Sequence, residues 1–248
     1  MCHGVAHIDA DITSSQFQSE MLQLCLDDRL GFVHMAPSCE TASRARDRPV
    51  RRILRQRGLP NPPRCRSDLH PLGLPGLEQS HPHLYARVVA ANRLYKLCAH
   101  LAGVLTQRGI PWSLEHPWRS YMWLLTDISA TLRAPRVGDV ITDFCMHGGS
   151  RKKRTRLRAF PVEDFVSVGL FCDGGHTHAP WLQGRSGTGF ATREEAEYPP
   201  DFCVALALCP TRLHKRPRLD LPELHPHALL GPLPVSPRDR TPAGQTPV

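Results

Sequence analysis

Short apolar segments with the character of β-strands alternate along this chain with segments of helical periodicity. Strands are predicted over residues 5–9, 32–36, 110–114, 140–145, 155–160 and 166–171. Helices are predicted from Ser14 to Gly31, over 84–107, over 119–132, and in a region that opens at Thr192 and resumes after Pro200 to about Leu208. This alternation predicts an α/β fold in which helices cover both faces of one sheet.

Two proline-rich segments interrupt this pattern. Residues 58–83 have no sustained periodicity, so we predict a long irregular insertion of the kind that is functional or mobile. Residues 210–248 contain nine prolines and almost no apolar pattern, which predicts a disordered tail. The predicted domains are therefore an α/β domain over 1–209, which carries the insertion, and the tail.

The apolar segments also exclude several classes of protein. The longest unbroken apolar run, 203–209, is far shorter than the ~20 residues that cross a bilayer, so no membrane span is expected. No signal-peptide pattern is present at the N-terminus, which predicts an intracellular protein, nuclear or cytoplasmic and not secreted. The nine cysteines include no C-x-x-C pair, so a disulfide scaffold is not expected.

The net charge of +8 is concentrated in two segments. Residues 44–66 carry nine arginines and one aspartate, and residues 151–158 carry six cations and no acid. Together these segments hold +14, which leaves −6 for the rest of the chain. Such local positive charge predicts a polyanionic partner, with nucleic acid as the leading candidate. The alternative is a pair of solvated basic faces or a localisation signal.

Reactive side chains follow three of the predicted strands. In open α/β sheets, ligands bind outside the carboxyl ends of the strands. Cys39 follows the 32–36 strand with three arginines nearby that would stabilise a thiolate, and Glu115 follows the 110–114 strand. The loop after Cys145 leads into the second basic segment. We therefore expect a thiol, a carboxyl group and a cationic patch to share one edge of the sheet.

These residues, in this order, resemble the cytosine-5 DNA methyltransferases and the related methylase-like domains of mobile-element proteins. The matching segments are Asp11-Ile12-Thr13, Pro37-Ser38-Cys39 with Ser43, Glu115-His116-Pro117, Arg151 to Arg156, and Glu197-Tyr198-Pro199-Pro200. The resemblance covers roughly residues 8–209. It implies a Rossmann-like class I methyltransferase sheet with helices on both faces.

The resemblance also implies a reaction and roles for individual residues. A Cys39 thiolate would add to C6 of cytosine, a neutral Glu115 would stabilise the resulting enamine at N3, and C5 would then take a methyl group from S-adenosylmethionine. Asp11 and Ile12 would lie near the adenine of this cofactor. DNA would be held by Ser43, Arg44, Arg46, Arg151, Lys153, Arg154 and Arg156, which would help to offset the free-energy cost of flipping the base.

The sequence departs from the family pattern at three places. Ser38 precedes the cysteine where the family has proline, and His116 follows the glutamate where the family has asparagine. The glycine-rich cofactor loop should precede Asp11, and no such motif is present there. We therefore expect a sheet that is incomplete at its N-terminal, cofactor-loop side, and a cofactor pocket that is incomplete with it.

Two other functions remain open at this point. A non-catalytic nucleic-acid-binding remnant of a mobile-element protein would use the same basic segments without Cys39. A cysteine hydrolase would need a histidine beside Cys39, and His34 and His116 are the available candidates. Nothing in the sequence indicates a specific protein partner.

A cluster of metal-ligand residue types lies near the second basic segment. Cys172, His176 and His178 are potential zinc ligands, with Cys145 or His147 as a fourth. Their spacing matches no standard zinc finger and shows one half-site where a structural site usually has two, so we predict a histidine-rich loop without metal.

Overall fold

The computed structural model describes residues 14–26, 30–50, 52–56, 58, 60–181 and 197–211. All of them belong to one compact unit. Three predictions lie outside the described residues: the 5–9 strand, the helical start at Thr192, and the tail from residue 212 onward. The predicted cofactor residues Asp11 and Ile12 also lie outside them.

Four strands form one mixed sheet in the order β1-β2-β4-β3. They are β1 (Val33–Met35), β2 (Trp112–Pro117), β3 (Gly138–Asp143) and β4 (Arg154–Phe160). β1 pairs parallel with β2, whereas β4 runs antiparallel to both β2 and β3. Three strands therefore point one way, and β4 is reversed between two of them. The predicted mixed α/β class is confirmed at this level.

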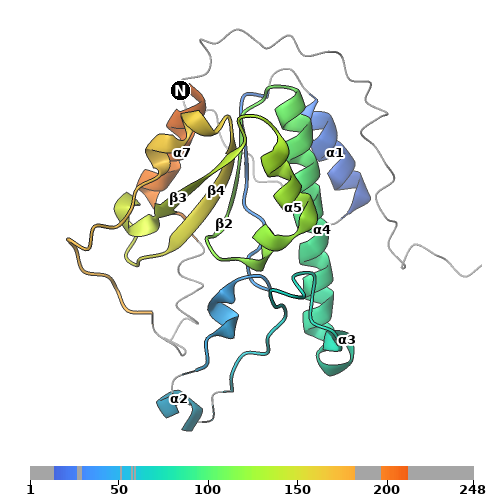
Figure 1. Ribbon diagram of the computed structural model, residues 1–248, viewed down its shortest axis with the longest axis vertical. Helices are drawn as coiled ribbons and strands as arrows, with labels where there is room; N and C mark the ends of the chain where they lie inside the picture. The colour runs from blue at the N-terminus through green and yellow to red at the C-terminus, as the bar shows by residue number, and fades with distance from the viewer. Residues whose placement is uncertain are drawn as a thin grey trace, which may run out of the picture. The chain divides into compact units, whose positions relative to one another are not determined.

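Helices lie on both sides of this sheet. Figure 1 shows α4 (Pro82–Gln107) and α5 (Thr126–Ala130) on one side and α7 (Pro200–Thr211) on the other. α1 (Ser15–Cys25) packs against α4. On the α7 side, Phe202 and Leu206 form a buried core with Leu157 of β4 and its neighbours. The two-sided arrangement follows from the apolar stripe that each long helix buries.

The ends of α1 and α4 follow from local chemistry. Ser14 caps α1 by accepting a hydrogen bond from the Phe17 amide. α4 begins with Pro82 in its first turn and ends before Gly109, whose φ of +68° suits the left-handed position after a helix. The prediction that Gly31 ends the first helix is wrong, because α1 ends at Cys25.

Two predicted elements are replaced by short turns. The helix predicted over 119–132 is divided into a 3₁₀ turn over Tyr121–Leu124, α5, and a 3₁₀ turn over Thr131–Arg133, because Leu125 has an extended backbone. The strand predicted over 166–171 is a 3₁₀ turn over Val166–Val168 followed by a loop. Phe165 and Val168 are fully buried while Val166 is 62% exposed, a spacing of three that suits a helical turn.

The described part of the proline-rich insertion is largely irregular and contains one short helix. α2 (Arg52–Gln56) precedes it, and α3 (Leu77–Ser80) lies within it. Cys65 and Leu77 pack in a buried cluster with Leu84 and Val88 of α4. The segment is therefore anchored on α4 through its own small core, which low periodicity in the sequence could not reveal. Among the described residues, no helix has the length and hydropathy needed to cross a membrane.

Candidate functional site

The two faces of β2 carry different chemistry. Glu115 lies within the strand, not after it as predicted, and it pairs with Leu157 of β4. Directly opposed residues share a face of the sheet, so Glu115 lies on the face of Leu157 and α7, and His116 lies on the α4 face. Glu115 is 6% exposed and His116 is fully buried. The strand therefore places a buried carboxyl group on the α7 side.

Two hydroxyl groups hold the Glu115 carboxyl group. Tyr198, just before α7, donates a hydrogen bond to Oε2 over 3.1 Å, and Thr155 of β4 donates to Oε1 over 3.2 Å. Burial raises the pKa of Glu115, while Lys153 and these two hydrogen bonds act in the opposite direction. The net effect favours the protonated carboxyl group, which is the form that donates a hydrogen bond to a ligand.

A relay of hydrogen bonds continues from Tyr198 to β1. The Tyr198 hydroxyl lies 3.1 Å from Nε2 of His34, and Nδ1 of His34 lies 2.8 Å from the Ser113 hydroxyl. One tautomer satisfies every partner: Nε2–H donates to Tyr198, Nδ1 accepts from Ser113, and Tyr198 donates to Glu115. Burial lowers the pKa of His34 to about 4, which keeps the imidazole neutral.

Cys39 lies in the loop after β1 and has a partly exposed, free thiol. The loop is fixed by Tyr95 of α4, whose hydroxyl donates a 2.7 Å hydrogen bond to the Ser38 carbonyl. Burial raises the pKa of the Cys39 thiol, Lys153 opposes this rise, and Glu115 adds to it. Lys153 and Glu115 therefore both contribute to the electrostatics of Cys39.

Two of the arginines expected to stabilise a Cys39 thiolate instead pair with carboxylates. Arg44 donates to Asp68 and lies over the Tyr121 ring at 4.3 Å, and Arg46 pairs with Glu40. Ser43 caps the turn that follows by accepting a hydrogen bond from the Ala45 amide. The cation that acts on Cys39 is Lys153, from the second basic segment.

The arginines of β4 face acidic residues on the neighbouring strand. The register of β3 and β4 sets Asp143 opposite Arg154 and Asp139 opposite Arg158. Arg154 forms two 2.8 Å hydrogen bonds to Asp143, and Arg158 binds Asp139 in the same bidentate way. Arg156 also pairs with Asp139 over 3.4 Å. The guanidinium groups of these three arginines therefore form ion pairs between neighbouring strands of the sheet.

Other predicted nucleic-acid contacts also have internal partners. Arg151 is 9% exposed, donates to the Pro180 carbonyl and lies near the Trp181 ring. Lys153 lies over the Phe144 ring at 4.7 Å. Among described residues of the two basic segments, the exposed cations are Arg48, Arg52, Arg55, Arg64 and Lys152. Charge density along the sequence could not separate the exposed cations from those with internal partners, because sequence alone does not show which arginine has a partner.

Neither candidate histidine for a cysteine hydrolase, His34 or His116, is hydrogen-bonded to the Cys39 thiol. Both ring nitrogens of His34 have the partners given above. His116 packs edge-on against Tyr95 and Trp123, and neither of its nitrogens has a hydrogen bond of standard geometry, although the Ser38 backbone lies nearby. Burial lowers the pKa of His116 to about 3. Among the described residues, no histidine is hydrogen-bonded to the Cys39 thiol.

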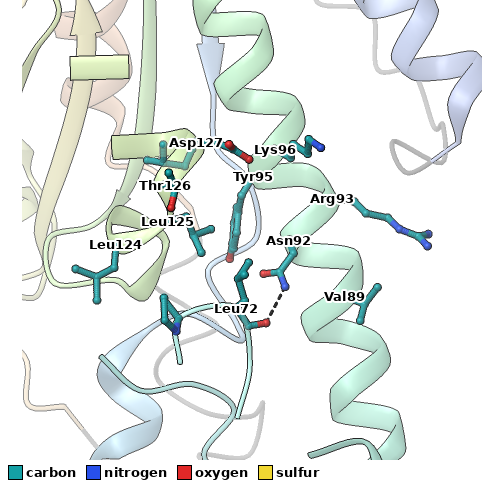
Figure 2. A pocket seen from close by; sticks show the side chains of 12 residues that line it. Leu72, Val89, Asn92, Arg93, Tyr95, Lys96, Leu124, Leu125, Thr126 and Asp127 are labelled. Atoms are coloured by element: carbon teal, nitrogen blue, oxygen red, sulfur yellow. Dashed lines mark hydrogen bonds between the residues drawn. The ribbon is translucent and has the colours of Figure 1, made fainter. Parts of the chain in front are cut away.

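A pocket of about 330 Å³ lies on the α4 side of the sheet. Figure 2 shows Tyr95 and Asn92 of α4 together with Leu124 and Leu125, while the Asn92 amide donates to the Leu72 carbonyl. Neither Cys39 nor Glu115 lines this pocket. A ligand bound in this pocket would therefore not contact Cys39 or Glu115.

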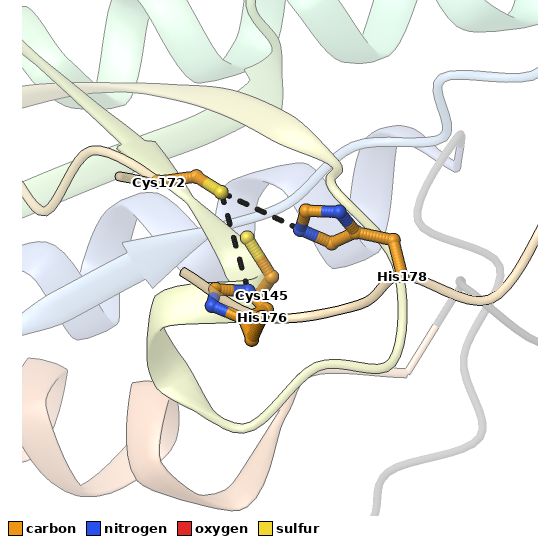
Figure 3. Close-up of side chains that lie close together, drawn as sticks. All are labelled: Cys145, Cys172, His176 and His178. Atoms are coloured by element: carbon orange, nitrogen blue, oxygen red, sulfur yellow. Dashed lines mark hydrogen bonds between the residues drawn. The ribbon is translucent and has the colours of Figure 1, made fainter. Parts of the chain in front are cut away.

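The metal-ligand types predicted near the second basic segment come together in the structure. Cys145, Cys172, His176 and His178 each place a ligand atom within 4.8 Å of the others, and Figure 3 shows how these side chains gather. His147, the other candidate fourth ligand, instead contacts Thr142 and the Val168 carbonyl. Cys145, and not His147, is therefore the fourth residue of this cluster.

Comparisons with protein-family models, curated proteins and solved structures gave no match. The functional argument therefore depends on the site itself.

Proposed function

We propose that this chain is a cytosine-5 methyltransferase-like protein whose Cys39 and Glu115 activate C5 of cytosine in nucleic acid. The observation that carries the proposal is the parallel pairing of β1 and β2 with Met35 opposite Leu114, so that the partly exposed Cys39 and the buried Glu115 both lie toward the same end of these strands. Lys153 contributes to the electrostatics of both groups. These groups come from β2, from the segment before β4 and from the loop after β1. Tyr198 and Thr155 hold the carboxyl group in place.

Each group has a defined part in the chemistry. The Cys39 thiol loses its proton to water, and Sγ bonds to C6 of the base. The C5=C6 electron pair moves to C4=C5, and N3, which gains the C4=N3 pair, takes a proton from Glu115. C5 becomes nucleophilic as a result. Lys153 favours the thiolate, whereas burial of Cys39 opposes it and raises the pKa of the thiol.

The sheet topology supports the same proposal. β1 and β2 are parallel neighbours, with Met35 opposite Leu114. Cys39 then follows one parallel strand and Glu115 lies near the end of its parallel neighbour, so both are near the carboxyl edge where ligands bind.

The cofactor that the resemblance implies is S-adenosylmethionine, which supplies a methyl group from its sulfonium centre. Asp11 and Ile12 lie outside the described residues. The pocket in Figure 2 lies on the other side of the sheet from Glu115. The residues that line this pocket include neither Cys39 nor Glu115, so it does not fit a cofactor that reacts beside Cys39.

Covalent trapping tests the proposal without a cofactor. An oligonucleotide carrying 2-pyrimidinone in place of one cytosine presents a more electrophilic C6, so we expect an adduct that survives denaturation and maps to Cys39. Cys39→Ser abolishes this adduct, and Glu115→Gln slows its formation by roughly 10²- to 10⁴-fold. Cys203→Ser, which removes an exposed thiol of α7, serves as the control and leaves the adduct unchanged. An equal adduct in Cys39→Ser, or none from the folded wild-type chain, overturns the proposal.

The exposed cations favour a second candidate function, non-catalytic binding of nucleic acid. Arg48, Arg52, Arg55 and Arg64 are all exposed. Each arginine that contacts a phosphate contributes roughly 0.9 to the slope of log affinity against log salt concentration. Replacing Arg52 and Arg55 with alanine should lower that slope by up to about 2. Binding that persists in Cys39→Ser, with no trapping in the wild type, favours this function over the first.

A further inference from the structure

Four side chains of the metal-ligand types converge at the end of β3. Cys145 lies in the 3₁₀ turn after β3, and the other three residues come from one loop, 172–178. The Cys172 Sγ lies 3.4 Å from Nε2 of His178 and 4.0 Å from Nε2 of His176. Figure 3 shows the two imidazoles and the Cys145 thiol around Cys172.

We propose that Cys145, Cys172, His176 and His178 bind one Zn²⁺ as a closed tetrahedral site. Zinc takes thiolate sulfur at about 2.3 Å and imidazole nitrogen at about 2.0–2.1 Å. A tetrahedron with these bond lengths has S···N edges of about 3.6 Å. The two measured S···N separations, 3.4 and 4.0 Å, lie on either side of that value. Small side-chain rotations would bring all four atoms onto one ion.

The choice of metal follows from the donor atoms. Two thiolates and two imidazoles in a four-coordinate arrangement favour Zn²⁺ over Mg²⁺ or Ca²⁺, which take oxygen ligands. Because four protein groups complete the tetrahedron, no position is left for a water molecule or a substrate. The site is therefore structural and not catalytic.

Groups around the cluster would orient its ligands. The Cys172 amide donates a 3.0 Å hydrogen bond to Asp143, which also binds Arg154. The Gly175 amide donates a 2.8 Å hydrogen bond to Asp173, which braces the turn between Cys172 and His176. Gly174, at φ +80°, makes the turn that returns the chain toward Cys172.

The metal would fix the 172–178 loop to the edge of the sheet. Beyond the loop, the Ala179 amide donates to the Ser150 carbonyl over 2.8 Å, and Arg151 donates to the Pro180 carbonyl. Ser150 and Arg151 lead directly into Lys153, the cation beside Cys39 and Glu115. Zinc would thus restrict the motion of the segment that positions Lys153. The metal proposal itself does not depend on the proposed methyltransferase chemistry.

Zinc content tests the proposal directly. The full chain, reduced, incubated with Zn²⁺ and passed through gel filtration, should retain about one zinc per chain by elemental mass spectrometry. Cys145→Ser and Cys172→Ser should each lose this zinc, whereas Cys203→Ser, the exposed-thiol control on α7, should retain it. A wild-type chain that retains no zinc, or a Cys145→Ser/Cys172→Ser double variant that retains all of it, overturns the proposal.

A cobalt titration of the wild-type chain keeps the test valid where a variant fails to fold. Tetrahedral Co²⁺ with two thiolates should give strong visible d–d bands and a near-ultraviolet thiolate charge-transfer band, and Zn²⁺ should displace both. His176→Cys should retain tight binding with a stronger charge-transfer band. An octahedral cobalt spectrum, or cobalt bands that excess Zn²⁺ does not displace, contradicts a zinc site.

Discussion

Tyr198 donates a hydrogen bond to Oε2 of Glu115 over 3.1 Å, although Tyr198 lies just before α7 and Glu115 lies within β2. The same hydroxyl lies 3.1 Å from His34, so one phenol links the C-terminal helix to the two parallel strands. The contact keeps one carboxyl oxygen satisfied while Thr155 satisfies the other. Because the Tyr198 hydrogen bond lowers the pKa of Glu115, the packing of the segment just before α7 affects the protonation of this carboxyl group.

Replacing Glu115 with glutamine should make the protein relatively more stable as the pH rises. Burial raises the pKa of Glu115 in the folded chain, so its contribution to stability is present below the unfolded pKa of about 4.3 and is lost as pH rises through the folded pKa. Urea denaturation at about pH 5 and about pH 8 should show the free energy of unfolding of Glu115→Gln rising relative to wild type. Glu78→Gln, on exposed α3, is the control, and parallel pH profiles for Glu115→Gln and wild type would contradict the prediction.

Replacing Tyr198 with phenylalanine should destabilise the fold by about 1–3 kcal/mol, because a buried carboxyl oxygen loses its donor. Since this hydrogen bond lowers the pKa of Glu115, its loss should raise that pKa further. Isotope-edited infrared spectra of the carboxyl group measure the change. Tyr85→Phe, at an exposed position of α4, should change neither quantity. A lower Glu115 pKa in Tyr198→Phe would refute the assignment of the donor.

Replacing Arg66 with alanine should destabilise the protein by about 3 kcal/mol or more. Arg66 is 1% exposed and donates to Thr41, Asn92 and the Pro71 carbonyl, so its loss leaves several buried acceptors without a donor. Chymotrypsin should then cleave faster near Leu69, which is 87% exposed. The matched control is Arg64→Ala, an exposed arginine two residues away, expected within about 0.5 kcal/mol of wild type. Equal effects of the two substitutions would show that Arg66 does not anchor the insertion.

Replacing Asp143 with asparagine should cost about 2–4 kcal/mol at neutral pH, because the bidentate pair with half-buried Arg154 is lost. The hydrogen bond from Arg154 lowers the pKa of Asp143. Its stabilisation is therefore present above the unfolded pKa of about 3.9 and is lost as pH falls through the folded pKa. Chemical denaturation should show the difference between variant and wild type shrinking at acid pH. Arg154→Lys, which keeps the charge but not the two-pronged geometry, should lose less, and a difference independent of pH would argue against the ion pair.

Local patterns predicted the elements whose signals are contained in a few adjacent turns. The apolar stripe over 84–107 and the β-branched and apolar run over 32–36 correspond to α4 and β1. The expectation that Cys39 and Glu115 share one edge of the sheet came from the rule that parallel strands end at one edge. The prediction of one continuous helix over 119–132 is wrong, because Leu125 has an extended backbone. Tertiary contacts can override a favourable local helical pattern in this way.

The role of the arginines could not be predicted from charge alone. The high cation density of residues 151–158 indicates a polyanion-binding surface, yet Arg154 and Arg158 lie opposite Asp143 and Asp139 in the β3–β4 register. Register depends on the long-range pairing of strands, and a shift of one residue would turn the same cations to the other face. The pairing with acids was therefore decided in three dimensions.

The sequence by itself determined which residue types were available: a thiol after one strand, a carboxyl group after the next, and cysteines and histidines near a basic segment. Tertiary structure alone decided how these groups are used. It buried Glu115 against Tyr198, made Lys153 the cation beside Cys39, and chose Cys145 over His147 as neighbour of Cys172. The physical reason is that the pKa of a group, its partner and its access to ligands depend on burial and short-range contacts between residues distant in the chain.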